Sequence, residues 1–281
     1  MRATGPVHED AHRAVHDHLA WIGRGPADLT ATALRVFAAA APDERLVLAT
    51  ADGAPGEVAE HHAADLASGR LMVIPALETY APVLDGGDGV GAAQLAVYDA
   101  FVDDALAAGW SGIRVVADNT PMLAGTDEQA ANWLAWEQVA DHWELRRPVQ
   151  GNCWFDASAL DPARLGAALS RHPATVGGEA AWRLSFEQDD DGALRLALAG
   201  ALDAFDAPQL RQALETSLQL AGSDAGTLEV TLRDVTFLHH NAAVALADAG
   251  ALPPGLRITA ASDTVRRLLD VMPAPPGLDV A

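Results

Sequence analysis

The sequence predicts an α/β protein with two units: an N-terminal three-layer unit built on a mainly parallel sheet, and a smaller C-terminal unit with a mixed sheet and helices. Strand-like apolar segments alternate with helix-like segments through about the first 180 residues, which is typical of a parallel sheet covered on both faces. The length of 281 residues suits about two domains. A Gly-Gly segment within residues 175–179 separates this first series from a second one.

The N-terminal elements are expected in alternating order. Apolar runs predict strands, and segments with apolar residues at helical spacing predict helices, two of which end at Gly69 and Gly109. The expected helices are 29–41, 57–68, 94–108, 127–146 and 162–170, and the expected strands are 45–51, 70–75, 112–118 and 149–155. Because ligands of parallel sheets bind outside the carboxyl ends of the strands, polar residues at these ends are candidates for a site.

The C-terminal elements begin with an apolar strand at 194–200 and a helix from Ala207. A strand with period-2 patterning follows at 227–234, and the polar cluster His239-His240-Asn241 then precedes an alanine-rich helix. Backbone amides at such a helix start are free to meet a partner or an anion. A last strand at 255–260 leads into a helix that Ser262 caps, with a buried stripe of Val265, Leu268, Leu269 and Met272.

This order of C-terminal elements resembles the STAS domain, the anti-sigma-factor antagonist fold, over about residues 183–281. The resemblance implies a module that binds another protein through the turn at His239, His240 and Asn241. It also implies the class of partner, an anti-sigma-factor kinase-like protein or other STAS proteins.

The turn departs from the phosphorylatable members of that family, which read Asp-Ser-Ser-Gly or Asp-Ser-Thr-Gly. Here the four positions are His239, His240, Asn241 and Ala242. Because an amide forms no stable phosphate ester, a kinase cannot use position 241 to add the charge of about −2 that disrupts an interface. We expect a domain held in its partner-competent form, or one that has lost the kinase input. The alternative is that the histidines only cap a helix on a surface that no longer binds a partner.

A second resemblance covers about residues 15–175. The residues that carry it are His18-Leu-Ala-Trp21, Leu77-Glu-Thr-Tyr80, Gly112-Ile-Arg-Val-Val-Ala-Asp118, Trp136-Glu137, Cys153-Trp-Phe-Asp156 and His172-Pro173. They resemble the MEDS sensory domain, which implies a fold related to RecA and KaiC and a ligand-sensing role. Members often read His-x-Cys-x-x-Tyr at the start, whereas Ala20 and Gly23 stand here for the Cys and Tyr. The expected organisation is therefore a MEDS-like domain at 15–175, a linker at 176–182 and a STAS domain at 183–281.

Candidate ligand-binding residues come from the strand ends, the tryptophans and the MEDS-like motifs. They are His18, Trp21, Glu78, Tyr80, Asp118, Trp136, Glu137 and Asp156. An aromatic-lined pocket with a few polar groups is the usual form of a small-molecule site, here for a small hydrophobic or organic ligand. The competing interpretation is that the tryptophans fill the core and the aspartates cap helices. Arg114 lies within an apolar strand, and we expect Glu137 to be its ion-pair partner.

Charge excludes several function classes. The formal net charge is −21, and all 18 basic residues are arginine, so a lysine of a phosphate-binding loop or a Schiff base is absent. The acidity disfavours nucleic acids and anionic membranes. The turn at 50–58, after the strand taken as first, lacks the phosphate-binding pattern and carries Asp52 and Glu57. Nucleotide hydrolysis is not expected, and a degenerate RecA-type nucleotide-binding protein remains as an alternative.

Neither metal nor covalent chemistry is expected from the residue patterns. Cys153 is the single cysteine, and its setting at a strand start is typical of a small buried residue in a reducing cytoplasm. Glu9, His12 and His16 share a helical spacing and His18 follows, but no His-Glu-x-x-His pattern or cysteine pair accompanies them, so surface histidines are expected. The N-terminus lacks the apolar region of a signal peptide, which favours a cytoplasmic location.

We therefore expect a non-enzymatic signalling protein without a cofactor, in which ligand occupancy in the first domain changes how the second presents its partner-binding face. The alternatives are the degenerate nucleotide-binding protein and a scaffold without a ligand. Sheet edges in either domain leave a homo-oligomer open.

Overall fold

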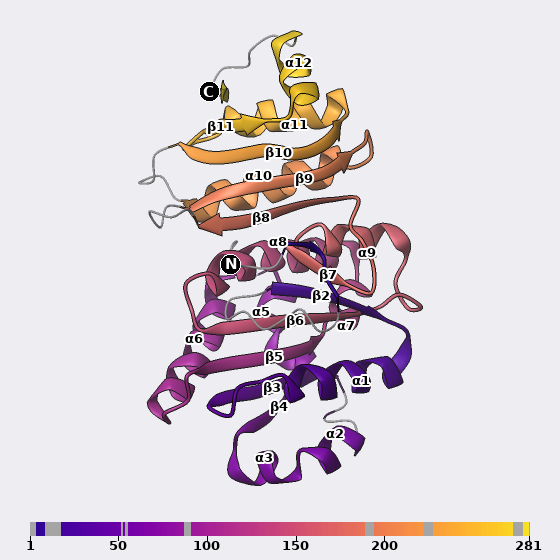
Figure 1. The fold of residues 1–281 in the computed structure, drawn as a ribbon, viewed down its shortest axis with the longest axis vertical. Coiled ribbons are helices and arrows are strands. Elements are labelled where there is room, and N and C mark those ends of the chain that lie inside the picture. The colour runs from indigo at the N-terminus through magenta and orange to yellow at the C-terminus, as the bar shows by residue number, and fades with distance from the viewer. Residues whose placement is uncertain are drawn as a thin grey trace.

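The structure is a computed structural model that describes residues 4–8, 18–51, 53, 56–86, 91–188, 194–221, 227–271 and 278–280. It contains two sheets, one in a first unit up to residue 176 and one in a second unit from residue 182 (Figure 1). The first sheet is parallel and the second is mixed, so the predicted α/β fold class is confirmed. His12 and His16 lie outside the described residues.

The first sheet has seven strands in the order β1-β7-β2-β6-β5-β3-β4. Every pair of neighbours in it is parallel. Its strands are β1 (Gly5–Pro6), β2 (His18–Gly23), β3 (Glu44–Thr50), β4 (Leu71–Pro75), β5 (Gly112–Asp118), β6 (Val149–Asp156) and β7 (Ala174–Val176).

Helices cover both faces of this sheet, as the alternation of strands and helices predicts. They are α1 (Gly25–Ala38), α2 (Gly56–His61), α3 (Ala63–Ser68), α4 (Ala76–Thr79), α5 (Ala81–Leu84), α6 (Ala92–Ala107), α7 (Thr120–Leu123), α8 (Asp127–Glu144) and α9 (Pro162–Leu169). Leu46 and Leu48 of β3 join the core cluster under α1, and Val47 and Ala49 join the one under α6 and α8. Because alternate residues of a strand point to opposite faces, the sheet packs against helices on both sides and the unit has three layers.

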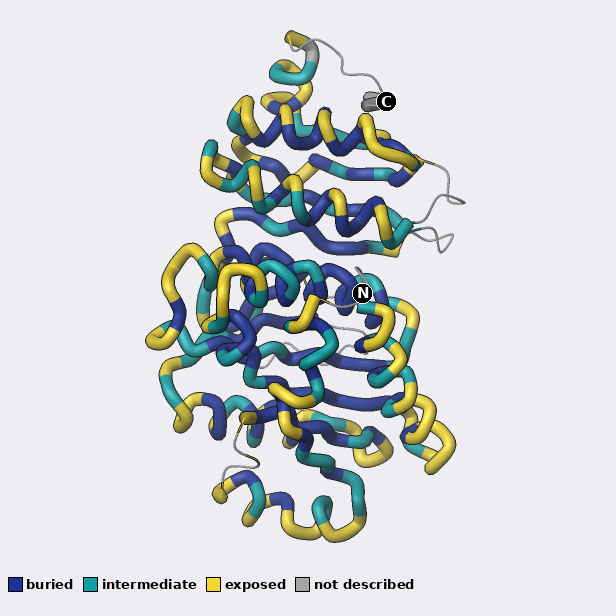
Figure 2. The backbone as a smooth tube through the Cα atoms, turned by 180° about the vertical axis from the view of Figure 1, so that it is seen from behind, coloured by how far each residue is buried: buried dark blue, intermediate teal, exposed yellow. Residues whose placement is uncertain are grey.

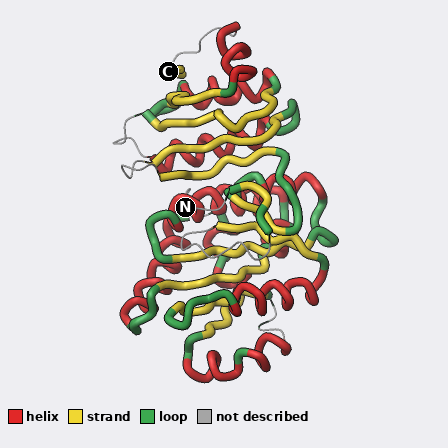
Figure 3. The backbone as a smooth tube through the Cα atoms, viewed as in Figure 1, coloured by secondary structure: helices red, strands yellow, loops and turns green. Residues whose placement is uncertain are grey.

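The second sheet has the order β12-β11-β10-β9-β8, and only the β8–β9 pair is antiparallel. Its strands are β8 (Trp182–Gln188), β9 (Leu194–Leu202), β10 (Leu228–Leu238), β11 (Leu256–Ala261) and β12 (Leu278–Val280). Helices α10 (Ala207–Ala221) and α11 (His240–Gly250) cover one face, and α12 (Asp263–Val271) follows β11. Figure 3 shows these helices on one side of the strands, and Figure 2, seen from behind, shows mostly buried strands beneath helices whose outer sides are exposed.

The two units meet along β8, the edge strand of the second sheet. Its free side faces α8 and the end of α9 rather than solvent. The amide of Leu184 donates to the Ser170 carbonyl at 2.9 Å, and the amide of Phe186 donates to Asp141 Oδ2 at 2.7 Å. Both donors are thereby satisfied although no strand pairs with that side of β8.

Two features differ from the expectations. His18–Gly23 is a strand, so β2 rather than β3 is the first long strand of the sheet, and Arg24 connects it to α1. The helix expected at 57–68 is divided into α2 and α3 at His62. Among the described residues, no helix has the length and apolar character needed to cross a membrane.

The expected pairing of Arg114 with Glu137 is wrong. Arg114 Nη2 lies 2.8 Å from Glu44 Oε2, and both side chains are nearly buried. Residues 113 and 115 of β5 face α6 and α8, so residue 114 must point to the opposite face of the sheet, away from Glu137. The principle of a buried cation needing a carboxylate holds, but the strand parity selects another partner.

Candidate functional site

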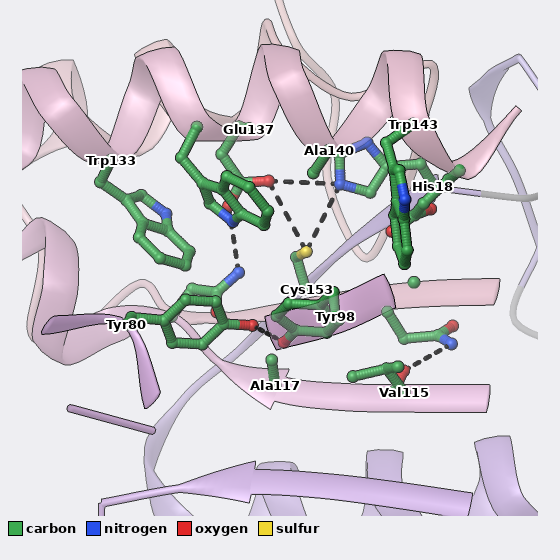
Figure 4. Close-up of a pocket in the computed structure, with 15 residues that line it drawn as sticks. His18, Tyr80, Tyr98, Val115, Ala117, Trp133, Glu137, Ala140, Trp143 and Cys153 are labelled. Atoms are coloured by element: carbon green, nitrogen blue, oxygen red, sulfur yellow. Dashed lines mark hydrogen bonds and ion pairs between the residues drawn. The ribbon is translucent and has the colours of Figure 1, made fainter. Parts of the chain in front are cut away.

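The candidate site lies between α8 and the strands β2, β5 and β6, on the face of the first sheet that α8 covers (Figure 4). It encloses a cavity of about 30 Å³. The lining residues are His18, Tyr80, Tyr98, Val115, Ala117, Asn119, Trp133, Trp136, Glu137, Ala140, Trp143, Glu144, Gly151, Asn152 and Cys153.

One wall of the cavity is aromatic. Tyr80 and Tyr98 stack at 5.9 Å between ring centroids, and their hydroxyls share a hydrogen bond. Trp133 meets the Tyr80 ring edge-on at 4.6 Å, and Trp136 lies 5.9 Å from the Tyr98 ring. Burial, and next the neighbouring Tyr98, raise the pKa of Tyr80 well above its usual value. The phenols therefore stay neutral and offer one hydroxyl hydrogen-bond network to a ligand.

Four polar side chains converge at the cavity: three of them line it, and His172 lies behind them. His18 Nε2 and His172 Nε2 lie 3.2 Å and 3.4 Å from Glu137 Oε2. Cys153 Sγ lies 3.5 Å from His18 Nε2 and 3.7 Å from Glu137 Oε2. The four donor atoms all lie within 4.8 Å of one another. We call His18, Glu137, Cys153 and His172 the His-Glu-Cys-His cluster.

Other groups fix the orientation of three of these side chains. Asp141 Oδ1 lies 3.3 Å from His18 Nδ1, and the Ala168 carbonyl lies 2.9 Å from His172 Nδ1. A carbonyl oxygen can only accept, so His172 Nδ1 carries the proton there. Asn119 Nδ2 donates to Glu137 Oε1 at 3.1 Å. Each of these ligand-type groups therefore turns its other polar atom toward the centre of the cluster.

Local structure explains how so much charge fits beneath α8. Glu137, Asp141 and Glu144 lie on one face of the helix because they are four and three residues apart. A Cβ atom at Gly151 of β6 would lie 2.3 Å from Glu144 Oε1. Only glycine leaves room there for the Glu144 carboxylate against the strand.

The ionisation of the cluster follows from burial and mutual charge. Burial lowers the pKa of His172 to about 4, with the neighbouring His18 as the next cause. Burial also acts to lower the pKa of His18, but Glu144, Cys153 and Asp141 outweigh it and raise that pKa well above its usual value. Burial and Glu137 raise the pKa of Cys153 to about 12. Of the two imidazoles, the surroundings therefore favour the charged form at His18 and the neutral form at His172.

The structure brings some of the sequence-derived candidates together and separates others. His18, Tyr80, Trp136 and Glu137 line the cavity. Trp21 is buried on the other face of β2, where its Nε1 donates to Asn152 Oδ1 at 3.0 Å. The three remaining candidates lie outside the lining: Glu78 is exposed on α4, Asp118 accepts from the Thr120 amide, and Asp156 accepts from the Gly25 amide.

The sequence reasoning missed Tyr98, Trp143, Glu144, Cys153 and His172 as members of the site. Cys153 carried the strongest available signal, because it belongs to a motif already quoted for the family resemblance. In the structure it pairs across the sheet with Ala20, the position where this chain lacks the family's cysteine. The thiol is therefore on the strand next to the expected one and on the same face as His18.

The start of α1 is the place where parallel sheets of this kind bind phosphates, because free amides point out of it beyond the end of the first strand. In this chain two carboxylates already accept from that turn. Asp28 Oδ2 accepts from the Arg24 amide at 2.7 Å, and Asp156 Oδ2 accepts from the Gly25 amide at 3.0 Å. A phosphate would meet negative charge there.

The polar turn of the second unit lies at the start of α11. His239 is the N-cap, and its Nδ1 accepts from the Asn241 amide at 3.2 Å. His240 and Asn241 are exposed. Phe205 follows β9, which ends beside β10 in parallel, and its side chain is 87% exposed. Together with the partly exposed Phe237, these residues form an accessible mixed surface at one end of the second sheet.

Comparison with known families matches residues 17–173 to the profile described as MEDS, the MEthanogen/methylotroph, DcmR Sensory domain. The matched segment is more than half of the chain and contains every residue of the His-Glu-Cys-His cluster. It ends before β7, so the STAS resemblance of residues 183–281 stays a prediction. No curated protein matches the chain.

Proposed function

The chain belongs to the MEDS family of sensory domains, and on that premise we propose that it is a non-enzymatic signalling protein. Its first unit senses a very small molecule in the cavity beneath α8. Its second unit acts as an anti-sigma-factor-antagonist-like module that binds a protein and lacks the phosphoacceptor residue at Asn241.

The size and lining of the cavity support a very small ligand. A water molecule needs about 10–15 Å³ of such volume, and the cavity has about 30 Å³. The aromatic wall suits a carbon group, whereas the Tyr80 and Tyr98 hydroxyls and the polar cluster suit one hydrogen-bonding atom. These features favour a small alcohol, aldehyde or amine over a nucleotide or a lipid.

Asp141 carries the proposal, because it connects the site to the second unit. One carboxylate oxygen faces His18 Nδ1, and the other accepts from the Phe186 amide of β8. The side chains of His18 and Asp141 are both fully buried. A ligand that shifts His18 or Glu137 therefore acts on the hydrogen bond that holds the edge of the second sheet. For signalling, ligand affinity must differ between the two states of that contact.

The exposed turn of the second unit supports the partner-binding role. Phe205, Asn241 and Phe237 present apolar and neutral polar groups, which suit a protein interface better than an anion site. The proposed partner is an anti-sigma-factor kinase-like protein or another STAS protein. Because Asn241 forms no phosphate ester, control of this interface falls to the first unit.

The degenerate nucleotide-binding protein is the weaker alternative. The amides that begin α1 already bond to Asp28 and Asp156, and the chain has no lysine. Calorimetry with ATP and magnesium separates the two proposals, since sub-millimolar magnesium-dependent binding would favour the nucleotide function.

The sensing proposal is tested by tryptophan fluorescence together with hydrogen exchange. A panel of small alcohols, aldehydes and amines is titrated into the full chain, because Trp133, Trp136 and Trp143 line the cavity. A binding compound should change the emission and also the exchange of residues 182–188 and 239–241. Asp141→Asn should keep the emission change and lose much of the distant exchange response, whereas the exposed Asp104→Asn should behave as wild type. Binding that leaves the second unit unaffected would contradict the proposed coupling.

The partner proposal is tested separately with wild-type and Asn241→Asp chains as baits in the native host. A kinase-like or STAS protein should be retained by the wild-type bait and released by the added charge. Equal capture by both baits would place the interface elsewhere.

A further inference from the structure

The His-Glu-Cys-His cluster offers two imidazole nitrogens, one thiol and one carboxylate from four distant parts of the chain. His18 lies on β2, Glu137 on α8, Cys153 on β6, and His172 follows α9. From this arrangement we propose that the four side chains bind one divalent zinc ion. The inference does not depend on the sensing proposal, since an ion can bind there with or without an organic ligand in the cavity.

The spacing of the donor atoms fits a tetrahedral ion. Zinc lies about 2.0–2.1 Å from nitrogen or oxygen ligands and about 2.3 Å from sulfur, which gives tetrahedron edges of about 3.3 Å and 3.5–3.6 Å. The observed edges from Glu137 Oε2 to the two imidazoles are 3.2 and 3.4 Å. Those from Cys153 Sγ to His18 and Glu137 are 3.5 and 3.7 Å. The other two pairs, from His172 to His18 and to Cys153, lie within 4.8 Å.

One of the four proposed ligand atoms is buried, faces the cluster and has no hydrogen-bond partner. His172 Nε2 is fully buried and has no such partner among the described residues. Its ring cannot turn to find one without breaking the bond from Nδ1 to the Ala168 carbonyl. A buried acceptor in this position costs stability unless a ligand satisfies it, and a metal ion does so.

The surroundings match those of metal-binding histidines and carboxylates. Such histidines usually donate their other ring N–H to a carboxylate or a backbone carbonyl. Here Asp141 serves His18 and the Ala168 carbonyl serves His172, while Asn119 holds the second oxygen of Glu137. A divalent cation would also offset the three carboxylates that α8 buries near the cluster, Glu137, Asp141 and Glu144.

The donor set selects the type of ion. Magnesium and calcium prefer oxygen ligands, whereas a thiolate with two imidazoles suits zinc and its neighbours among the first-row metals. Four protein donors fill a tetrahedral zinc site. We therefore expect an ion that is held by the chain and orders α8 against β2 and β6.

The test uses the full chain after treatment with a chelator. Cobalt(II) replaces zinc as a spectroscopic probe, and a thiolate-to-cobalt charge-transfer band should appear and saturate at one ion per chain. Since Cys153 is the single cysteine, the band must come from its thiol, either at a site within one chain or at a contact between two chains. Dilution separates these sources, because the band of an intrachain site scales with protein concentration. Absence of the band in the wild-type chain would overturn the proposal.

Zinc affinity, measured by competition with a chromophoric chelator, then identifies the other ligands. Cys153→Ser, His172→Gln and Glu137→Gln should each weaken binding by about tenfold or more, since even outer groups at zinc sites contribute that much. His142→Gln is the matched control, because this histidine lies on α8 but packs on Phe186 away from the cluster. His12→Gln/His16→Gln tests the N-terminal histidines. Equal affinity in all variants, or loss only in the N-terminal pair, would contradict the assignment.

Discussion

The two units bury their polar residues in opposite ways. The first unit buries ionisable groups in its interior, including His18, Arg114, Glu137, Asp141 and His172. In the described part of the second unit, the buried polar residues are hydroxyl-bearing ones, Ser185, Thr216 and Ser217. Buried charge lowers stability unless it is paired, so its retention in one unit marks a place where chemistry rather than packing shapes the interior. The second unit places its polar groups at the exposed start of α11.

The buried ion pair of the first unit should give the largest effect. Glu44→Ala leaves Arg114 charged and buried without its partner, which should lower the free energy of unfolding by about 3–5 kcal/mol. Urea unfolding measures this change. The double variant Glu44→Leu/Arg114→Met should recover most of the loss, because it removes both charges. A double variant as unstable as the single one would show that packing, rather than the unpaired charge, dominates.

The second unit should respond through packing alone. Leu246 on α11 is fully buried among aliphatic side chains, so Leu246→Ala should lower the free energy of unfolding by about 2–5 kcal/mol. Thermal and urea unfolding should agree on this loss. The effect should not change between pH 5 and pH 8 (about the range set by carboxyl and imidazole groups), because no buried ionisable group of the described second unit lies beside it. A pH-dependent loss would weaken the comparison between the units.

Two glycines of the first unit provide a smaller, matched contrast. Gly151→Ala should lower the free energy of unfolding by about 1–3 kcal/mol, because its Cβ would overlap the Glu144 carboxylate. Gly166 lies within α9, where a Cβ would meet nothing within 4 Å. Gly166→Ala should therefore stabilise the chain by about 0.5–1 kcal/mol through helix propensity. Equal effects at the two positions would show that Glu144 moves aside freely.

The smallest expected effect is a pH dependence at the contact between the units. His142 packs against Phe186 of β8, and burial, followed by the charge of Arg146, lowers its pKa to about 4. The unfolded value is about 6.5, so the unfolded chain binds more protons between these pH values, and stability falls as the pH drops from 6.5 towards 4. His142→Phe keeps a ring there without a titrating group. Its unfolding free energy should decline less steeply over this window, and identical slopes would exclude His142 as a cause.

Most of the secondary structure could be predicted from the sequence. The strand at 112–118 was predicted to the residue, because a glycine ends the preceding helix and an apolar β-branched run follows. The strand β2 was missed, although its six residues His18–Gly23 form the centre of the sheet beside β6. A six-residue run carrying a histidine and a tryptophan gives little periodic signal.

The site was only partly predictable, because it depends on which strands are neighbours. His18 and Trp21 are three residues apart on one strand, so they must point to opposite faces, and knowledge of β2 alone would have removed Trp21 from the site. Cys153 and His172 could not be added in this way. Their approach to His18 requires the strand order β7-β2-β6, which local patterns do not determine.

The contact along β8 has a consequence for handling the protein in pieces. A fragment beginning near residue 180 would keep its own core but would lose Ser170 and Asp141, the acceptors for the Leu184 and Phe186 amides. A bare sheet edge of this kind recruits other strands, so such a fragment should self-associate. The N-terminal unit thus covers the exposed edge strand of the C-terminal unit, and we expect the two units to be handled as one protein rather than as separable domains.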